Sequence, residues 1–232
     1  MVFGERNSGT NLASELLRRN LPGLHDIPGD RIGEFGFAYG WKHAFPQMIA
    51  APPSTLAVCV FRHPETWVQS MYRRPWHLVP ALRDRPFADF LRGEWAARID
   101  ETNFGIAPGD PRWGAELHWD RHPLTGKRFA NICELRTVKT AGFLSLPNRF
   151  ANCLLIRHED VAAAPEAFVE TVARWYGLGR ASDFTPVTTR RGRAAAEIYR
   201  ASAYGALEPA DRDFLWQQLD ATQEARLGYT PG

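Results

Sequence analysis

The sequence predicts an α/β fold, in which a central, mostly parallel sheet is flanked by helices in three layers. Three observations predict it. A glycine-rich loop over residues 4–10 lies between a short apolar start and a helical pattern. Two uninterrupted apolar runs, residues 55–61 and 153–156, are typical of strands that are buried on both faces. Helical patterns alternate with these runs, as they do in parallel sheets whose strands are joined by crossover helices.

The first half of the chain supplies the elements around the glycine-rich loop. A helix is expected over residues 11–20, because three leucines form an apolar stripe and a Pro-Gly pair ends it. A short strand is expected over residues 37–41, and the apolar run 55–61 forms the next strand. Pro64 then begins a helix, since the first helical turn tolerates proline.

The second half adds an insertion, a strand and several helices. Residues 75–126 are rich in Pro, Trp, Arg and His and are expected to form a helical and irregular insertion. It would cap the strand ends, where α/β folds bind ligands. Apolar spacing predicts helices over residues 86–99, 128–146, 165–176, 194–203 and 209–219. With 232 residues, the chain is expected to be one domain, residues 1–232.

Composition excludes several classes of protein. Hydrophobic residues make up 44% and charged residues 23%, which is ordinary for a globular chain. The net charge of +2, from 28 basic and 26 acidic residues, argues against a nucleic-acid partner. The three cysteines have no paired short spacing, which favours a reducing compartment over a disulfide framework or a metal site.

The start of the chain bears on localisation. It lacks the basic head and apolar stretch of a signal peptide, and no apolar run approaches about 20 residues. We therefore expect a cytoplasmic protein without a transmembrane segment, with peripheral membrane contact and oligomeric state left open. The abrupt start before Gly4 leads us to expect that a few N-terminal residues are missing.

The glycine-rich loop carries the first chemical signal. Gly4 and Gly9 have the spacing of a phosphate-binding P-loop, in which backbone N–H groups and a helix N-terminus hold an anion. The lysine that should follow the second glycine is absent, and Thr10 stands there instead. This makes a nucleoside triphosphate a poor ligand. A tight strand-to-helix connection without a ligand is the alternative.

A second motif follows the strand 55–61. Arg62 and Pro64 form an Arg-x-Pro sequence, and Ser70 lies eight residues after the arginine. With the Ser-Gly-Thr of the loop, this arrangement resembles the sulfotransferase family that uses 3′-phosphoadenosine 5′-phosphosulfate. The resemblance implies a P-loop-like fold and that co-substrate, with Arg62 and Ser70 on its 3′-phosphate. A guanidinium fork and a hydroxyl are suitable phosphate donors.

A third segment, Lys-His-Ala-Phe-Pro at residues 42–46, is similar to the family's Lys-Thr-His-Leu-Pro. The resemblance implies that Lys42 contacts the transferring sulfuryl group and that a histidine is the general base. His43, however, is one place early, and a one-residue shift on a strand reverses the side-chain direction. His43 is nevertheless the first choice for the base, because bulges at strand ends re-aim side chains, and Glu94 or Glu116 is held in reserve.

Two later segments extend the resemblance. Arg190, Arg191 and Gly192 resemble the Arg-Lys-Gly that closes over the 3′-phosphate in the family. The segment 157–160 looks like the Arg-Tyr-Glu-Asp element of bacterial members, and its two carboxylates are interpreted as structural. Arg136 and Lys139 lie three apart on a helix and are expected to form a solvated basic face rather than an acceptor site.

The loop also departs from the family pattern. Asn7 stands where the family has its loop lysine, and Leu12 stands where cytosolic members have a tryptophan that stacks on adenine. Arg6 or Lys42 could replace the missing cation. The expected nucleotide-binding residues of the loop share this one segment: Arg6, Asn7, Ser8, Gly9, Thr10 and Asn11.

The expected function is transfer of a sulfuryl group to a hydroxyl or amine, with no metal required. The acceptor would be a small molecule or a glycan, because tryptophans of the insertion suit stacking on the sugar rings of a carbohydrate or glycolipid: Trp76, Trp95, Trp113 and Trp119. Core packing is their alternative role. A P-loop kinase acting on a small molecule and a non-catalytic nucleotide-binding module remain as alternative functions.

Overall fold

The computed structural model describes residues 1–27, 39–189, 198 and 202–231. The strands are β1 (Val2–Phe3), β2 (Leu56–Phe61) and β3 (Asn152–Arg157). The helices are α1 (Thr10–Asn20), α3 (Pro64–Arg73), α4 (Phe87–Arg92), α5 (Ile132–Leu144), α6 (His158–Ala163), α7 (Pro165–Tyr176), α8 (Pro209–Gln218) and α9 (Ala221–Arg226). Short 3₁₀ turns are η1 (Pro80–Leu82), η2 (Thr102–Phe104), η3 (His118–Asp120) and η4 (Leu146–Asn148).

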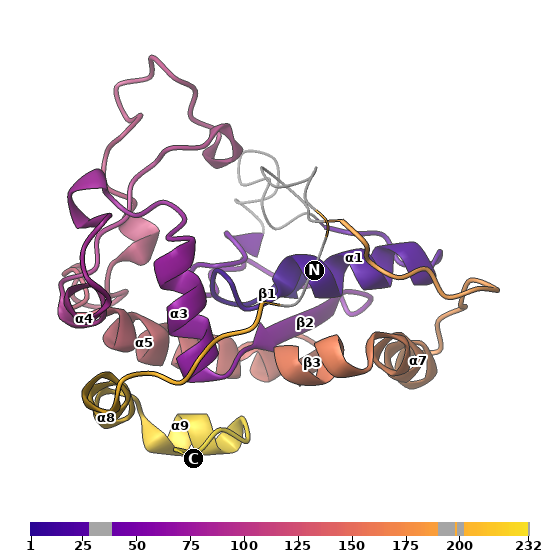
Figure 1. The fold of residues 1–232 in the computed structure, drawn as a ribbon. Coiled ribbons are helices and arrows are strands. Elements are labelled where there is room, and N and C mark those ends of the chain that lie inside the picture. The colour runs from indigo at the N-terminus through magenta and orange to yellow at the C-terminus, as the bar shows by residue number, and fades with distance from the viewer. Residues whose placement is uncertain (28–38, 190–197, 199–201, 232) are drawn as a thin grey trace.

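The three strands form one parallel sheet in the order β1-β2-β3 (Figure 1). Val2 pairs with Val58, and Leu56 to Phe61 pair with Asn152 to Arg157. Every residue of the central strand β2 is buried, as its unbroken apolar sequence predicts. The carboxyl ends of β1 and β2 lead directly into the glycine-rich loop and Arg62.

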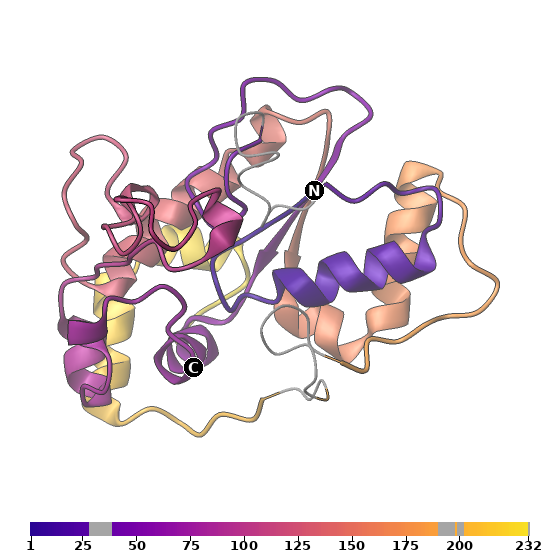
Figure 2. The ribbon, with the colours of Figure 1, turned by 90° about the horizontal axis from the view of Figure 1, so that it is seen from above.

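Helices cover both faces of the sheet, as Figure 2 shows from above. Alternate side chains of β2 divide between two cores, because successive residues of a strand point to opposite faces. Leu56, Val58 and Val60 pack with α1 and α7. Ala57, Cys59 and Phe61 pack with α5, η4 and the segment after α9. The predicted α/β class and helix-flanked parallel sheet are confirmed.

A third core joins the insertion to the helices beside the sheet. It gathers side chains of α3, α4, α5 and α8 around the fully buried Trp67 and Trp95. The insertion itself is mostly irregular and is tied by isolated antiparallel bridges, such as Leu78 with Ala97 and Trp95 with Phe129. It extends away from the sheet on the side of α3 and α4 (Figure 1).

Several predicted boundaries are wrong. The helix expected over 86–99 ends at Arg92, and Trp95 to Ala97 then form bridges instead of continuing it. Within the strand expected over 37–41, the described residues are Tyr39, which is helical, and Gly40 and Trp41, which are not in a strand. Gly40 has a φ of 73°, which turns the chain. The helix expected over 194–203 lies largely outside the described residues.

Candidate functional site

The glycine-rich loop connects β1 to the N-terminus of α1. Gly4 has a φ of 145°, and a Cβ there would lie 2.4 Å from the carbonyl oxygen of Val60. Gly9, the N-cap residue of α1, has a φ of 99° and gives the helix no side-chain cap. The first-turn N–H groups of α1 and the positive end of its dipole therefore face the loop, as they do in anion-binding helix termini.

Ser8 supplies an independent indication of a ligand. Its side chain lies inside the loop, with Oγ 2.7 Å from where a Cβ of Gly4 would be. Ser8 is 2% exposed, and Oγ has no hydrogen-bond partner among the described residues. Leaving a buried hydroxyl unpaired costs roughly 1–3 kcal/mol. A phosphate or sulfate oxygen accepting from Ser8 and the loop N–H groups would satisfy it.

Lys42 and His43 lie at the two ends of the loop. The Nζ of Lys42 donates to Oδ1 of Asn11 at 2.8 Å, in the first turn of α1. The Nδ1 of His43 is 2.5 Å from the carbonyl oxygen of Gly4. Because residues 42–45 form a turn rather than a strand, the expected reversal of His43 does not occur. Its ring points to the loop.

The contact to Gly4 also determines the tautomer of His43. A carbonyl oxygen only accepts hydrogen bonds, so Nδ1 must carry the proton. The lone pair of the neutral ring then lies on Nε2. A general base needs its lone pair on the nitrogen away from the orienting hydrogen bond, which is the arrangement found here.

Arg62 directly follows β2 and reaches the loop at Asn7. Its Nη1 donates to the carbonyl oxygen of Asn7 at 3.0 Å, and its Nε donates to Oγ1 of Thr66 at 3.2 Å. Asn7 has a φ of 61°, a left-handed conformation that asparagine tolerates well. Its Nδ2 donates to the carbonyl oxygen of Arg74, at the end of α3. Asn7 thus joins the loop to α3.

Arg62 and Ser70 share one neighbour, Tyr204, in the segment before α8. The Tyr204 ring lies 5.1 Å from the Arg62 guanidinium carbon, and its hydroxyl is hydrogen-bonded to Ser70 and Arg62. Burial raises the pKa of Tyr204, but these hydrogen bonds and the charge of Arg62 together lower it below its ordinary value. The pair predicted to bind one phosphate therefore does converge on one oxygen.

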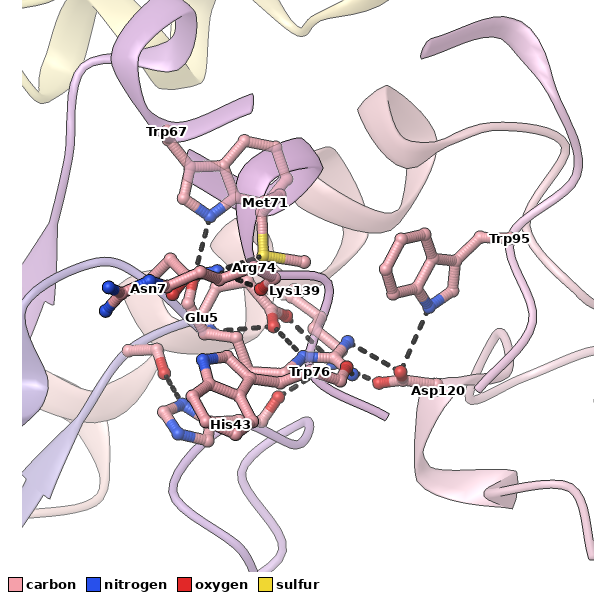
Figure 3. Close-up of polar contacts among 12 residues, drawn as sticks. Glu5, Asn7, His43, Trp67, Met71, Arg74, Trp76, Trp95, Asp120 and Lys139 are labelled. Carbon is pink, nitrogen blue, oxygen red and sulfur yellow. Dashed lines mark hydrogen bonds and ion pairs between the residues drawn. The ribbon is translucent and has the colours of Figure 1, made fainter. Parts of the chain in front are cut away.

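A buried network of four charged side chains packs against the loop (Figure 3). Arg6 pairs with Asp120 at 2.6 Å and with Glu5 at 2.8 Å. Lys139 pairs with the same two carboxylates, at 2.5 Å and 2.8 Å, and also donates to the carbonyl oxygen of His43 at 2.8 Å. Trp95 donates to Asp120 at 3.0 Å. The side chains of the four charged residues are at most 8% exposed.

The network pairs two basic side chains with two acidic ones and favours the charged forms of Asp120 and Arg6. Burial alone would raise the pKa of Asp120, but Arg6 and Lys139 lower it well below its usual range. Burial would lower the pKa of Arg6, but Asp120 and Glu5 raise it. Two cations facing two anions leave no net charge to solvate, which makes so deep a burial tolerable.

This network corrects two predictions. Arg6 is predicted as a phosphate contact, but its guanidinium is directed to Asp120, Glu5 and the carbonyl oxygen of Trp76, so we assign it to the support of the loop. The solvated basic face expected of Arg136 and Lys139 is wrong. Arg136 is buried against Trp67 and pairs with Glu224 through Nε and Nη2, each at 2.7 Å.

His158 packs against the loop from the end of β3. A Cβ on Gly9 would lie 2.3 Å from Nδ1 of His158, so only glycine allows this approach. That Nδ1 is buried and has no hydrogen-bond partner among the described residues. Burial and the nearby charge of Arg62 lower the pKa of His158 to about 4, so the ring is neutral at pH 7.

The structural role expected of Glu159 and Asp160 agrees with their contacts. Glu159 accepts from the backbone N–H of His63 and from the hydroxyl of Tyr229, both at 2.9 Å. Asp160 pairs with Arg157. These bonds hold the start of α3 and the C-terminal segment against the end of the sheet.

The insertion places an aromatic cluster beside His43. The ring centroid of Trp41 lies 5.2 Å from that of His43, edge to face, and 6.3 Å from that of Trp119, on which Trp41 stacks. Trp95, expected as a possible sugar platform, is instead fully buried in the core. His77, beside Trp41, pairs with Asp100 at 2.5 Å.

The two reserve bases are held in surface ion pairs. Hydrogen bonds from Arg128 and Arg121 lower the pKa of Glu116 to about 2, which leaves it a weak proton acceptor. Glu94 pairs with Arg128 and is 57% exposed. These contacts favour His43 over either carboxylate.

Arg190, Arg191 and Gly192 lie outside the described residues. Sequence reasoning missed four residues that shape the site, Glu5, Asp120, His158 and Tyr204, and it wrongly placed a fifth, Lys139, on a solvated face. Asp120 and Lys139 meet the loop only in three dimensions, and no spacing in the sequence marks them. His158 had a local signal, its position at the end of the strand 153–156.

Within the described ranges, none of the helices combines the length and apolar character that crossing a membrane requires. Searches against protein-family models, curated proteins and solved structures find nothing that matches this chain.

Proposed function

We propose that this chain is a sulfotransferase with a P-loop-like fold, which transfers the sulfuryl group of 3′-phosphoadenosine 5′-phosphosulfate to a hydroxyl or amine acceptor. The observation that carries the proposal is the arrangement around one loop. A helix N-terminus without a side-chain cap and a buried, unpartnered Ser8 hydroxyl form its centre. Lys42 and His43 lie at its ends, and Arg62 with Ser70 lies beyond Asn7.

Two anionic groups of the nucleotide would bind on different residues. The N–H groups of Gly9 and Thr10 and the Ser8 hydroxyl would hold the 5′-phosphosulfate, whereas the Ser8 N–H donates to the carbonyl oxygen of Glu5 within the loop. Arg62 and Ser70 would hold the 3′-phosphate, which distinguishes this donor from AMP and ADP. Because Arg62 also binds the carbonyl of Asn7, the two subsites share one rigid segment.

The chemistry is an in-line displacement at sulfur. The acceptor oxygen or nitrogen forms a bond to sulfur while the bond from sulfur to the bridging phosphate oxygen breaks, and adenosine 3′,5′-bisphosphate leaves. His43 would take the acceptor proton on Nε2. Lys42 would stabilise the negative charge that develops on the transferring group and the leaving oxygen.

Calorimetric titration of three nucleotides tests the proposal. Wild-type protein should bind adenosine 3′,5′-bisphosphate more tightly than AMP, and ATP should bind poorly because the loop lacks the P-loop lysine. Arg62→Ala should weaken binding of the bisphosphate by about 10- to 100-fold, the loss of a charge-assisted contact of roughly 1.5–3 kcal/mol. AMP has the same 5′-phosphate and should be affected little.

Arg149→Ala is the matched control, since Arg149 is exposed and, among the described residues, its side chain bonds locally to Ser145. It should leave all three affinities unchanged. If Arg62→Ala weakens the binding of the bisphosphate and of AMP equally, Arg62 does not bind the 3′-phosphate. Tighter binding of ATP than of the bisphosphate would favour the kinase alternative.

A further inference from the structure

The side chain of Tyr204 lies between two arginines and a serine. Its ring is 5.1 Å from the guanidinium carbon of Arg62 and 4.5 Å from that of Arg73. Its hydroxyl is hydrogen-bonded to Ser70, Ser202 and Arg62. One aromatic side chain thus contacts both residues that the proposed function assigns to the 3′-phosphate.

The Tyr204 oxygen is the acceptor in the bond with Arg62. A guanidinium only donates, so Arg62 donates to the phenol oxygen. The bonds from Ser70 and Ser202 lower the pKa of Tyr204 together with the charge of Arg62, as donors to a phenolate do. Arg62 and Ser70 therefore direct to Tyr204 the donors that a phosphate oxygen would need.

The backbone around Tyr204 lies along the exposed side of α3. Gln69 donates to the carbonyl oxygen of Gly205 at 3.1 Å, and Arg73 donates to that of Ala203 at 3.3 Å. Figure 1 shows this segment crossing α3 on its way to α8. Both bonds are exposed side chain-to-backbone contacts, which are individually weak, so breaking them to move residues 203–205 away from α3 costs little.

We propose that Tyr204 occupies the 3′-phosphate subsite of the ligand-free protein, and that a nucleotide carrying a 3′-phosphate displaces it. The inference rests on the proposed function, because it takes the same subsite. A phosphate dianion is a stronger hydrogen-bond acceptor for Arg62 and Ser70 than a neutral phenol, so the phosphate replaces the Tyr204 hydroxyl. A nucleotide without that phosphate leaves Tyr204 in place.

Tyr204→Phe isolates the hydroxyl, since phenylalanine keeps the ring over both arginines. Without the competing oxygen, calorimetry should show about 3- to 10-fold tighter binding of adenosine 3′,5′-bisphosphate and an AMP affinity within about 2-fold of wild type. Tyr72→Phe is the matched control. Tyr72 is on α3, as Ser70 is, but its hydroxyl donates to the carbonyl oxygen of Arg85. It should change neither affinity.

Displacement has a readout of its own. Saturating adenosine 3′,5′-bisphosphate should accelerate chymotrypsin cleavage after Tyr204 by several-fold, mapped by mass spectrometry, whereas AMP should not. If the Tyr204→Phe protein binds the bisphosphate more weakly, or if the bisphosphate protects Tyr204 from cleavage, Tyr204 does not compete for the subsite. The proposed sulfotransferase function would be unaffected by either result. A wild-type protein with no preference for the bisphosphate over AMP would overturn both the inference and the proposed function.

Discussion

At the scale of single residues, one hydrogen bond both aims the His43 ring and determines which nitrogen holds its proton. The carbonyl of Gly4 accepts from Nδ1, and Lys139 holds the backbone carbonyl of the same histidine. Lys42 is placed by Asn11 at the other end of the loop. The residues proposed as base and cation, His43 and Lys42, are therefore positioned by the same segment that would bind the donor.

Substitution of these two residues should separate their roles. Lys42→Met should lower kcat by at least about 100-fold with product-nucleotide affinity nearly unchanged, because in the proposed mechanism Lys42 would stabilise charge that develops only in the transition state. His43→Gln should lower the rate by about 10²–10⁴ and also remove an ionisation between about pH 5 and 8 from the rate profile. Both are measured with labelled donor and an acceptor found by screening hydroxyl and amine compounds. A His43→Gln profile that keeps the wild-type ionisation would exclude His43 as the base.

The spacing of Arg62 and Ser70 shows how far sequence reasoning reaches at this scale. Eight residues across a strand end and a helix start allow the two side chains to meet, and the structure brings both to Tyr204. The direction of Arg6 was not predictable. It depends on Asp120, a residue 114 positions away.

At the scale of elements, the junction of the loop with α1 is tightly constrained. Gly9 combines a left-handed backbone with direct contact to His158. The strand, loop and helix around it were predictable because apolar runs and glycine spacing are local signals. The expected helix over 86–99 failed because tertiary bridges from Trp95 and Ala97 outweighed a local apolar pattern.

Gly9→Ala should therefore abolish nucleotide binding. The new Cβ strains a φ of 99° and collides with the imidazole of His158. A second variant, Gly9→Ala with His158→Ala, removes the collision but not the strain and should restore only part of the affinity. Gly179→Ala is the control, because a Cβ there meets nothing within 4 Å. Normal binding by the Gly9→Ala protein would show that the loop does not need this conformation.

The four-charge network should dominate the stability of the loop. Asp120→Asn removes a carboxylate shared by two buried cations and should lower the free energy of unfolding by about 3–5 kcal/mol in urea denaturation. Adding Lys139→Met restores charge balance around Arg6 and Glu5, so the double variant should be less destabilised than Asp120→Asn alone. Asp110→Asn removes an exposed pair with Arg112 and should have little effect. A double variant less stable than the single one would contradict the charge-balance argument.

At the scale of the whole molecule, buried imidazoles link stability to pH. The pKa of His158 is about 4 in the folded protein, and burial also lowers that of His63. Between pH 6.5 and 4 the unfolded chain binds a proton at residue 158 that the folded chain does not. Stability must therefore fall as the pH drops through this window.

The contribution of His158 should reach at most roughly 3 kcal/mol at pH 4. Urea denaturation at pH 7.0, 5.5 and 4.5 should show a steeper loss of stability for wild type than for His158→Gln. His118→Gln, at an exposed histidine, serves as the control and should keep the wild-type slope. Parallel slopes for wild type and His158→Gln would show that this imidazole is not held neutral by the fold.

The sequence separations inside the site imply an order of assembly. Arg6 reaches its partner Asp120 across 114 residues, and Arg136 reaches Glu224 across 88. Contacts this distant form late, because long loops must close before they contribute. During folding, Glu5 and Arg6 remain hydrated until the segments that carry Asp120 and Lys139 have docked, although α1 beside them needs only neighbouring residues. Refolding protein should therefore recover its helix content before it recovers the ability to bind a nucleotide.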